Sequence, residues 1–287
     1  MNAMMKWDRE RMLRAAIPVL LAVATAAVFV PVLHNGFVNW DDDATVAENL
    51  AFRQPGGPAL RWMFTTFYLG HYQPLSWLSF TLDYFVWGLN PAGYHLTSMI
   101  LHAVNAALFY LLCVRLLRLA KPEWDRRTFE VGAALAALLF ALHPLRVESV
   151  AWATERRDVL SGTFFFLTML AYLKAVTAAE SNAYVKWLGA ALGAYMLSLL
   201  SKATAMTLPV ALIAIDFFPL RRIDGNGIGR RRVWLEKLSF LILGAAAAVV
   251  AGFAQHASGA MDTFTKHTPA QRLAQASFAV WYYIEKT

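Results

Sequence analysis

The sequence is poor in cysteine and in charged residues. Its single cysteine, Cys113, lies within an apolar stretch, which excludes an intrachain disulfide and a zinc site built on paired cysteines. Charged residues make up 16% of the chain and hydrophobic residues 58%, whereas soluble domains hold about 25% and about 45–50%. Because the apolar residues gather in several long blocks, the sequence predicts an all-α polytopic membrane protein rather than a soluble one.

The formal net charge of +7 does not indicate a nucleic-acid partner. The basic residues cluster in short segments between apolar blocks, which is typical of cytoplasmic loops. Lys6, Arg9, Arg11 and Arg14 precede the first block, so we expect a cytoplasmic N-terminus and an uncleaved first helix. This orientation places residues 34–92 and 143–158 on the outer face, periplasmic or luminal, and the compact loops favour a bacterial inner membrane.

The apolar blocks predict about seven membrane-spanning helices. These are residues 15–33, 94–117, 129–142, 159–173, 184–200, 205–220 and 238–253. The first outer loop, 34–92, is rich in aromatic residues but is interrupted by Gly70 and Pro74, so we expect two short helices lying in the membrane interface. Its Trp and Phe side chains favour an interfacial belt over sugar-binding platforms. Residues 272–287 resemble the start of a further membrane element, so we expect 1–287 to be the N-terminal part of a longer domain.

A run of three acidic residues, Asn39-Trp40-Asp41-Asp42-Asp43, follows the first predicted span. A carboxylate at the lipid–water boundary can act as a general base toward a hydroxyl group, which makes Asp41 and Asp42 the candidate catalytic residues. The candidate substrate-lining residues are His71, Tyr72, His95 and His143. Two plainer interpretations stay open: the acids solvate a helix end, and His95 forms a buried hydrogen-bonding stripe with His102 and Asn105.

The second outer loop, 143–158, is the other candidate cluster. Its acids are Glu148, Glu155 and Asp158, and the spacing of seven would put the two glutamates on one face of a helix. The candidate phosphate-binding cations are Arg146, Arg156, Arg157 and Lys202. The alternative is a structural knot of ion pairs at residues 155–158. Carboxylates also suit Mg²⁺ or Mn²⁺, so the clusters are consistent with a divalent metal between them and equally with a phosphate site made of cations alone. For Asp216, near the end of a predicted span, local pairing beside Arg221 is favoured over a functional role.

Three groups of motifs carry a resemblance to a known family. They are Phe37-Val38-Asn39-Trp40-Asp41-Asp42-Asp43 with Tyr72-Gln73-Pro74-Leu75-Ser76-Trp77, Leu142-His143-Pro144-Leu145-Arg146-Val147-Glu148-Ser149 with Glu155-Arg156-Arg157-Asp158, and Ser201-Lys202-Ala203 with Thr207-Leu208-Pro209. In their order they resemble the membrane domain of transmembrane and tetratricopeptide-repeat proteins, a family similar to protein O-mannosyltransferases of the GT-C superfamily. The further helices and tetratricopeptide repeats common in that family are absent from residues 1–287.

The resemblance implies a GT-C-like helical bundle with its active site on the outer face. It also implies a polyprenyl-phosphate-sugar donor, an acidic motif that falls on Asp41 and Asp42, and a second acidic region at Glu148, Glu155 or Asp158. We therefore expect a glycosyltransferase that moves a mannose-like sugar to a hydroxyl of a protein Ser/Thr or a glycan. The alternatives are a transporter or flippase of a lipid-linked solute, with ionisable groups at mid-membrane, and a non-catalytic membrane scaffold.

Overall fold

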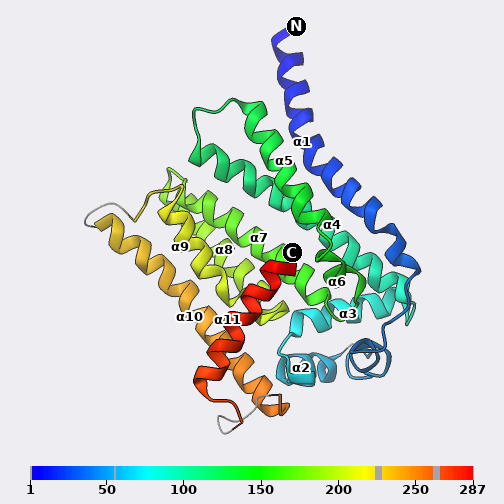
Figure 1. Ribbon diagram of the computed structural model, residues 1–287. Helices are drawn as coiled ribbons and strands as arrows, with labels where there is room; N and C mark the ends of the chain where they lie inside the picture. The colour runs from blue at the N-terminus through cyan, green and yellow to red at the C-terminus, as the bar shows by residue number, and fades with distance from the viewer. Residues whose placement is uncertain (1, 55, 224–227, 261–265, 287) are drawn as a thin grey trace.

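The computed structural model describes residues 2–54, 56–223, 228–260 and 266–286, and its regular elements there are all helical. The helices of the bundle run up and down (Figure 1). They are α1 (Asn2–Phe29), α4 (Pro91–Ala120), α5 (Arg126–Leu142), α7 (Arg156–Val176), α8 (Ser181–Ser201), α9 (Leu208–Phe217) and α10 (Ile228–Ala257). Three further helices, α2 (Gly57–Thr65), α3 (Pro74–Trp87) and α6 (Arg146–Ala151), lie in the two loops predicted to face outward. We call this side of the bundle the loop end.

Each of the seven predicted spans is helical, but five are long and apolar enough to cross a membrane. These five are Ala15–His34, Pro91–Ala120, Arg156–Val176, Ser181–Ser201 and Arg231–Ala257. The prediction of seven full spans is corrected for two segments. Helix α5 has 17 residues and begins with charged side chains, and α9 has 10 residues and follows a 3₁₀ turn, Ala203–Thr207. At about 1.5 Å per residue neither covers the ~30 Å apolar core of a bilayer.

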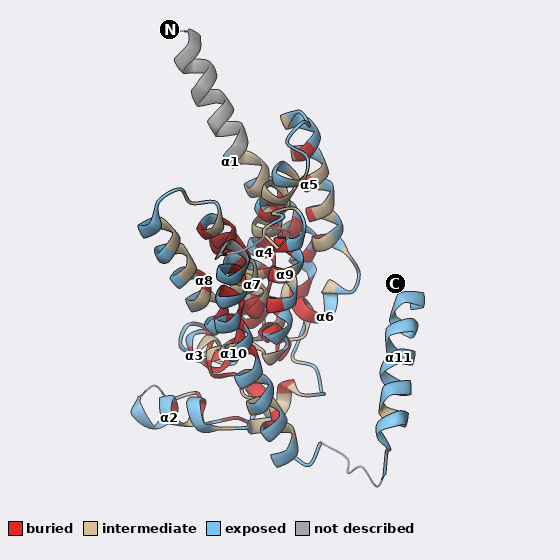
Figure 2. Cartoon of the chain, turned by 90° about the vertical axis from the view of Figure 1, so that its left-hand side faces the viewer, coloured by how far each residue is buried: buried red, intermediate tan, exposed pale blue. Residues whose placement is uncertain are grey.

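Polar side chains join the central helices. Ser161 of α7 and Ser198 of α8 donate hydrogen bonds to each other's backbone carbonyls at 3.1 and 2.8 Å. Asn105 of α4 donates to the Val159 carbonyl at 2.8 Å and accepts from Thr163 at 2.8 Å. Figure 2 shows the buried residues concentrated along α4 and α7. These hydrogen bonds fix the start of α7, which carries several of the candidate site residues.

A separate aromatic core supports the first outer loop. Phe52, Met63, Trp77, Phe80 and Tyr94 are buried together there. The expectation of an interfacial belt is therefore wrong for Trp77 and Phe80, which have no exposed surface. It stays a prediction for the exposed aromatic residues of the same loop, which include Phe64, Phe85 and Trp87. The loop folds inward because packing these rings against one another removes their apolar surface from water.

The turn between α3 and α4 is closed by three local signals. Asn90 accepts a hydrogen bond from the Ala92 amide and Pro91 opens the helix, a common start for an α-helix. Trp87 packs on Gly93, where a Cβ atom would lie 2.1 Å from the indole ring, so only glycine fits. The turn brings the start of α4 against the beginning of the first outer loop, where Tyr94 packs on Phe37 and His95 lies beside Gly36.

The last described helix, α11 (Pro269–Lys286), stands apart from the bundle in Figure 2 and has no buried residue. The predicted further membrane element is thus a helix, but it is not among the helices apolar enough to span. The basic side chains predicted to hold the N-terminus in the cytoplasm, Lys6, Arg9, Arg11 and Arg14, lie outside the described side chains.

Candidate functional site

Asp42 joins the two outer loops. Its carboxylate accepts hydrogen bonds from the Thr154 amide at 2.8 Å and the Thr154 hydroxyl at 2.6 Å, and from the Val38 amide at 3.1 Å. The residue has no exposed surface. The two predicted acidic clusters therefore meet in one place. The Asp42 side chain is occupied by structural hydrogen bonds, which leaves it poorly placed to accept a proton from a substrate.

The neighbouring carboxylate of Asp41 is differently placed. Asp41 is partly exposed, and its side chain has no hydrogen-bond or ion-pair partner within the described part of the chain. Its backbone carbonyl accepts from the Thr45 amide at 2.7 Å, which starts the short helical turn Asp43–Ala47. Tyr68 donates to the Ala44 carbonyl at 3.0 Å and holds this turn in place. The backbone at Asp41 is thus anchored, and its carboxylate oxygens are available.

An alternating chain of charges lies beside the Asp42–Thr154 junction. Glu155 accepts from the Arg157 Nε at 3.0 Å and from the Lys202 Nζ at 2.7 Å. Lys202 also lies 2.5 Å from an oxygen of Asp158, whose other oxygen accepts from Ser149 at 3.1 Å. Burial by itself would raise the pKa of Glu155, but the hydrogen bonds and charges of Arg157 and Lys202 lower it to about 2. Glu155 is therefore a fixed anion that positions two cations.

His71 faces the same cations. With Tyr72, Gln73, Arg157, Lys202 and Gln255 it lines a cavity of about 50 Å³ at the loop end. Burial and the nearby charge of Arg157 lower the pKa of His71 to about 4, so its imidazole is neutral at pH 7. Burial raises the pKa of Tyr72, whose hydroxyl donates to the Phe64 carbonyl at 3.2 Å.

The structure corrects the placement expected for Arg156. Its guanidinium has no exposed surface, lies 2.5 Å from a carboxylate oxygen of Asp83, and donates to the Tyr94 carbonyl at 2.7 Å. The Phe80 and Tyr94 rings flank it at 4.7 and 5.4 Å. Arg156 cannot reach a donor phosphate from this position, and its role is to hold α3 and α4 against α7. Within residues 155–158 the predicted ion pair forms between Arg157 and Glu155, whereas Arg156 pairs with Asp83 outside that segment.

Four other predicted residues lie outside this chain of charges. Glu148 is exposed on α6, whereas Glu155 is buried in the turn after it, so the expectation that one helix face carries both is wrong. Arg146 lies over the Phe140 ring at 4.5 Å. His143 accepts from the Leu145 amide at 3.3 Å. His95 is buried, with its Nε2 3.3 Å from the Gly36 carbonyl, which fits the predicted hydrogen-bonding stripe better than a substrate-lining role.

The prediction for Asp216 is confirmed in kind, with other partners. Asp216 is buried and pairs with Lys237 at 2.5 Å and Arg222 at 3.0 Å, and it accepts from Tyr172 at 2.7 Å. The pairing is local, as expected, but it does not involve Arg221. It lies at the opposite side of the bundle, which we call the basic end.

Sequence reasoning missed three residues that shape the site. Thr154 binds Asp42, Asp83 neutralises Arg156, and Gln255 of α10 donates to the Gly70 carbonyl at 2.8 Å beside His71. Thr154 could have been predicted as a site residue, because it directly precedes the candidate residue Glu155. Nothing in the sequence around Gln255 separates it from an ordinary polar residue at a helix end.

Within the described ranges no group of three or more His, Cys, Asp or Glu side chains is arranged to hold a metal ion. The carboxylates of Asp42 and Glu155 are occupied by different partners. They are therefore not arranged with Asp41 to share one divalent cation. The described residues therefore do not form a binding site for Mg²⁺ or Mn²⁺. The positive charge beside Glu155 comes from Arg157 and Lys202.

Comparison with curated proteins gives one consistent relationship. The chain is 34% identical over 158 residues to protein O-mannosyl-transferase tmtc2 of Xenopus laevis, covering 55% of this chain and 18% of the relative. The chain resembles the protein O-mannosyl-transferases. It is 35% identical over 170 residues to Tmtc2 of Drosophila melanogaster, another protein O-mannosyl-transferase, covering 57% and 16% of the two chains. It is 41% identical over 103 residues to TMTC2 of Mus musculus, covering 36% and 11%.

These matches confirm the resemblance expected from the motifs. The chain covers less than a fifth of the length of these protein O-mannosyl-transferases, and just over half of its own residues align with the first two. No family model matches the chain, and no solved structure matches it significantly.

Proposed function

We propose that this chain is the N-terminal part of an integral membrane glycosyltransferase of GT-C type. It transfers a mannose-like sugar from a polyprenyl-phosphate donor to a hydroxyl, of a protein Ser/Thr or a glycan, at the loop end of the bundle. The observation that carries the proposal is the junction of Asp42 with Thr154. In its support, the junction anchors the loop that carries Asp41 to Thr154, the residue before Glu155, and Glu155 pairs with Arg157 and Lys202. The names of the relatives support the same reaction class.

Asp41 is the general base in this proposal. The acceptor oxygen forms a bond to the anomeric carbon of the sugar as the bond from that carbon to the phosphate oxygen breaks. The hydroxyl proton passes to the Asp41 carboxylate, and the departing phosphate keeps the electron pair. Asp42 holds the loop at the correct position, because both of its oxygens are already used by Thr154 and Val38.

Lys202 and Arg157 stabilise the negative charge that develops on the departing phosphate. Lys202 has the more accessible side chain, at 22% exposed against 9% for Arg157. Glu155 forms ion pairs with both cations and so fixes their positions. Asp158 pairs with Lys202 until the donor phosphate replaces the Asp158 carboxylate. Fixed cations in a partly buried site stabilise such charge without reorganisation during the reaction.

A second cavity offers a place for the lipid part of the donor. It has a volume of about 280 Å³ and is lined by Asp158, Ser161, Gly162, Phe165, Thr204, Ala205 and Thr207. It lies between the start of α7 and the 3₁₀ turn Ala203–Thr207, and Asp158, the partner of Lys202, is part of its lining. Its mixed polar and apolar lining suits a phosphate group followed by a prenyl chain.

The test is sugar transfer by membranes that contain the full-length protein, supplied with radiolabelled polyprenyl-phosphate-mannose. We expect label in acceptor protein for the wild type. Lys202→Met should lower transfer and raise the KM for the donor, by about 10–100-fold if a charge-assisted contact to phosphate is lost. Lys186→Met is the matched control, because Lys186 is exposed on α8 at the basic end. Absence of transfer by the wild type with mannosyl and other hexosyl donors, or a normal KM for Lys202→Met, would contradict the proposal.

A further inference from the structure

A cavity at the basic end lies far from the candidate site. It has a volume of about 380 Å³ between the ends of α4 and α7, and it is lined by Arg115, Arg118, Leu119, Leu173, Lys174 and Thr177. Arg118 follows His95 by 23 positions on the same helix, which corresponds to about 35 Å. Both helices are long and apolar enough to cross a membrane. Their ends, and so this cavity, therefore lie at the depth of lipid headgroups.

Three cations line this cavity without a neutralising carboxylate. Arg115 donates to the Leu170 carbonyl at 3.1 Å, Arg118 lies over the Phe129 ring at 4.7 Å, and Lys174 lies over the Trp187 ring at 4.0 Å. No acidic residue is among the lining side chains, and within the described residues none of the three cations forms an ion pair. Packing holds the cations in place and leaves their charge unbalanced.

Helix ends attract cations, but that preference does not explain this arrangement. One cation in the last turn is enough to complement the dipole of each helix, and Arg118 and Lys174 fill those places. Arg115 adds a second like charge one turn from Arg118 on the same helix, and like charges at this spacing repel each other. An anion bound between the three side chains would remove this repulsion.

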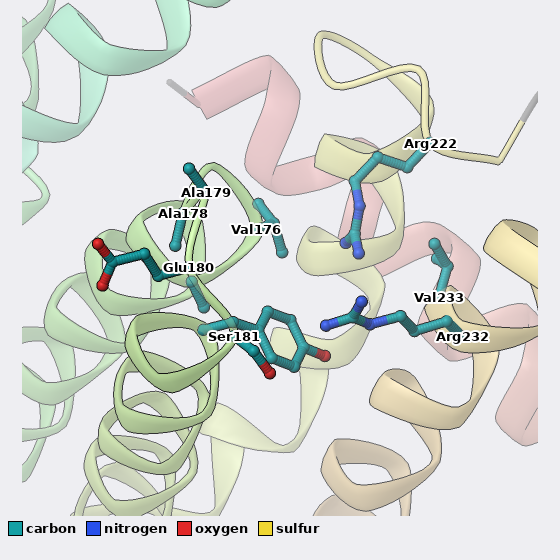
Figure 3. A pocket seen from close by; sticks show the side chains of 10 residues that line it. Val176, Ala178, Ala179, Glu180, Ser181, Arg222, Arg232 and Val233 are labelled. Atoms are coloured by element: carbon teal, nitrogen blue, oxygen red, sulfur yellow. The ribbon is translucent and has the colours of Figure 1, made fainter.

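The neighbouring cavity provides a contrast. Figure 3 shows it, with Arg222 and Arg232 extending into a space of about 390 Å³. Arg222 lies 2.9 Å and Arg232 3.6 Å from a carboxylate oxygen of Glu236. Both of its cations are thus ion-paired within the protein, whereas those of the cavity between α4 and α7 are not.

We propose that the cavity between α4 and α7 binds the phosphate of an anionic phospholipid. Arg115, Arg118 and Lys174 contact the phosphate oxygens, while Leu119 and Leu173 border the cavity on the apolar side, where an acyl chain lies. The headgroup depth of the cavity favours a lipid over a soluble phosphate compound, since basic pockets between spanning helices are common sites for such headgroups. This site is independent of the proposed sugar transfer.

Native mass spectrometry of the full-length protein in detergent tests the proposal. Phosphatidylglycerol and phosphatidylcholine are titrated separately, and we expect the anionic lipid to bind more tightly by about tenfold or more. The variant R115Q/R118Q/K174Q should weaken phosphatidylglycerol binding by about fivefold for each charge removed. The control K121Q/R127Q/R231Q removes three exposed charges from the same end of the bundle and should bind as the wild type does. R118Q/K174Q keeps the Arg115–Leu170 hydrogen bond and repeats the test if the triple variant does not fold.

Two results would overturn the proposal. Equal weakening in the cavity and control variants would show that diffuse charge attracts the lipid. Equal affinity of the wild type for the two lipids would exclude an anionic site. A competition arm separates the sources of phosphate: inorganic phosphate or glycerol 3-phosphate at millimolar concentration should leave the lipid bound, and displacement by either would assign the cavity to a soluble phosphate compound instead.

Discussion

Asp42 and Thr154 are joined by two hydrogen bonds, of 2.8 and 2.6 Å, across 112 positions of sequence. One carboxylate oxygen accepts both bonds, and the other accepts from the Val38 amide. The pair closes the first outer loop, which carries Asp41, onto the second. Every role proposed for the site depends on this junction.

The first prediction concerns the strength of this junction. Asp42→Asn and Thr154→Val should each destabilise the protein, since a hydrogen bond to a charged group contributes about 1.5–3 kcal/mol. The double variant should lose less than the sum of the two single losses, because both remove the same contact. Thermal unfolding of the purified variants in detergent measures the three values. Additive losses would show that the two side chains are not coupled.

The second prediction concerns the buried pair of Arg156 and Asp83. Arg156→Met should destabilise the protein by about 3–5 kcal/mol, because it leaves the Asp83 carboxylate buried without its partner. Burial already raises the pKa of Asp83, and Arg156 opposes that rise. Adding Asp83→Leu to Arg156→Met should restore part of the loss, since two apolar side chains leave no unpaired charge. Unfolding curves of the single and double variants test this. If the double variant is no more stable than Arg156→Met alone, the pairing does not account for the loss.

The third prediction concerns pH. The pKa of His71 is about 4 in the folded chain, against an ordinary value of 6.5, because of burial and the charge of Arg157. The unfolded chain therefore binds more protons between these two values, and stability should fall as pH drops from about 6.5 toward 4. His71→Gln removes this contribution and should flatten the dependence of the melting temperature on pH in that window. The same slope in the variant and the wild type would contradict the assignment.

The sequence predicts the helices well because long apolar blocks and basic flanks are local signals. It overestimates the number of spans at α5 and α9. The charged start of α5 is visible in the sequence, but the 3₁₀ turn that shortens α9 is not. The positions of α2 and α3 were also predictable, from Gly70 and Pro74. Their inward fold around Trp77 was not, because burial of an aromatic ring depends on residues distant in sequence.

The roles of adjacent residues are the part that sequence could not assign. Arg156 and Arg157 follow each other at the start of α7, where one step turns the side chain by about 100°. One guanidinium therefore enters the core beside Asp83, and the other remains beside Glu155 and Lys202. Asp41 and Asp42 separate in the same way, one toward solvent and one toward Thr154. The two members of each pair are the same residue type at adjacent positions, so the sequence gives no means of telling their roles apart.

The central claim is that Asp41, and not its neighbours, is the catalytic base. The most direct measurement compares sugar transfer from radiolabelled polyprenyl-phosphate-mannose by full-length wild type, Asp41→Asn and Asp43→Asn at equal expression. Asp43 lies on the same loop, is also partly exposed, and begins the turn Asp43–Ala47, which makes it the matched control. We predict that Asp41→Asn loses transfer by about 10²–10⁴-fold, the usual contribution of a general base, with an unchanged melting temperature. Normal transfer by Asp41→Asn, or an equal loss in Asp43→Asn, would contradict the account.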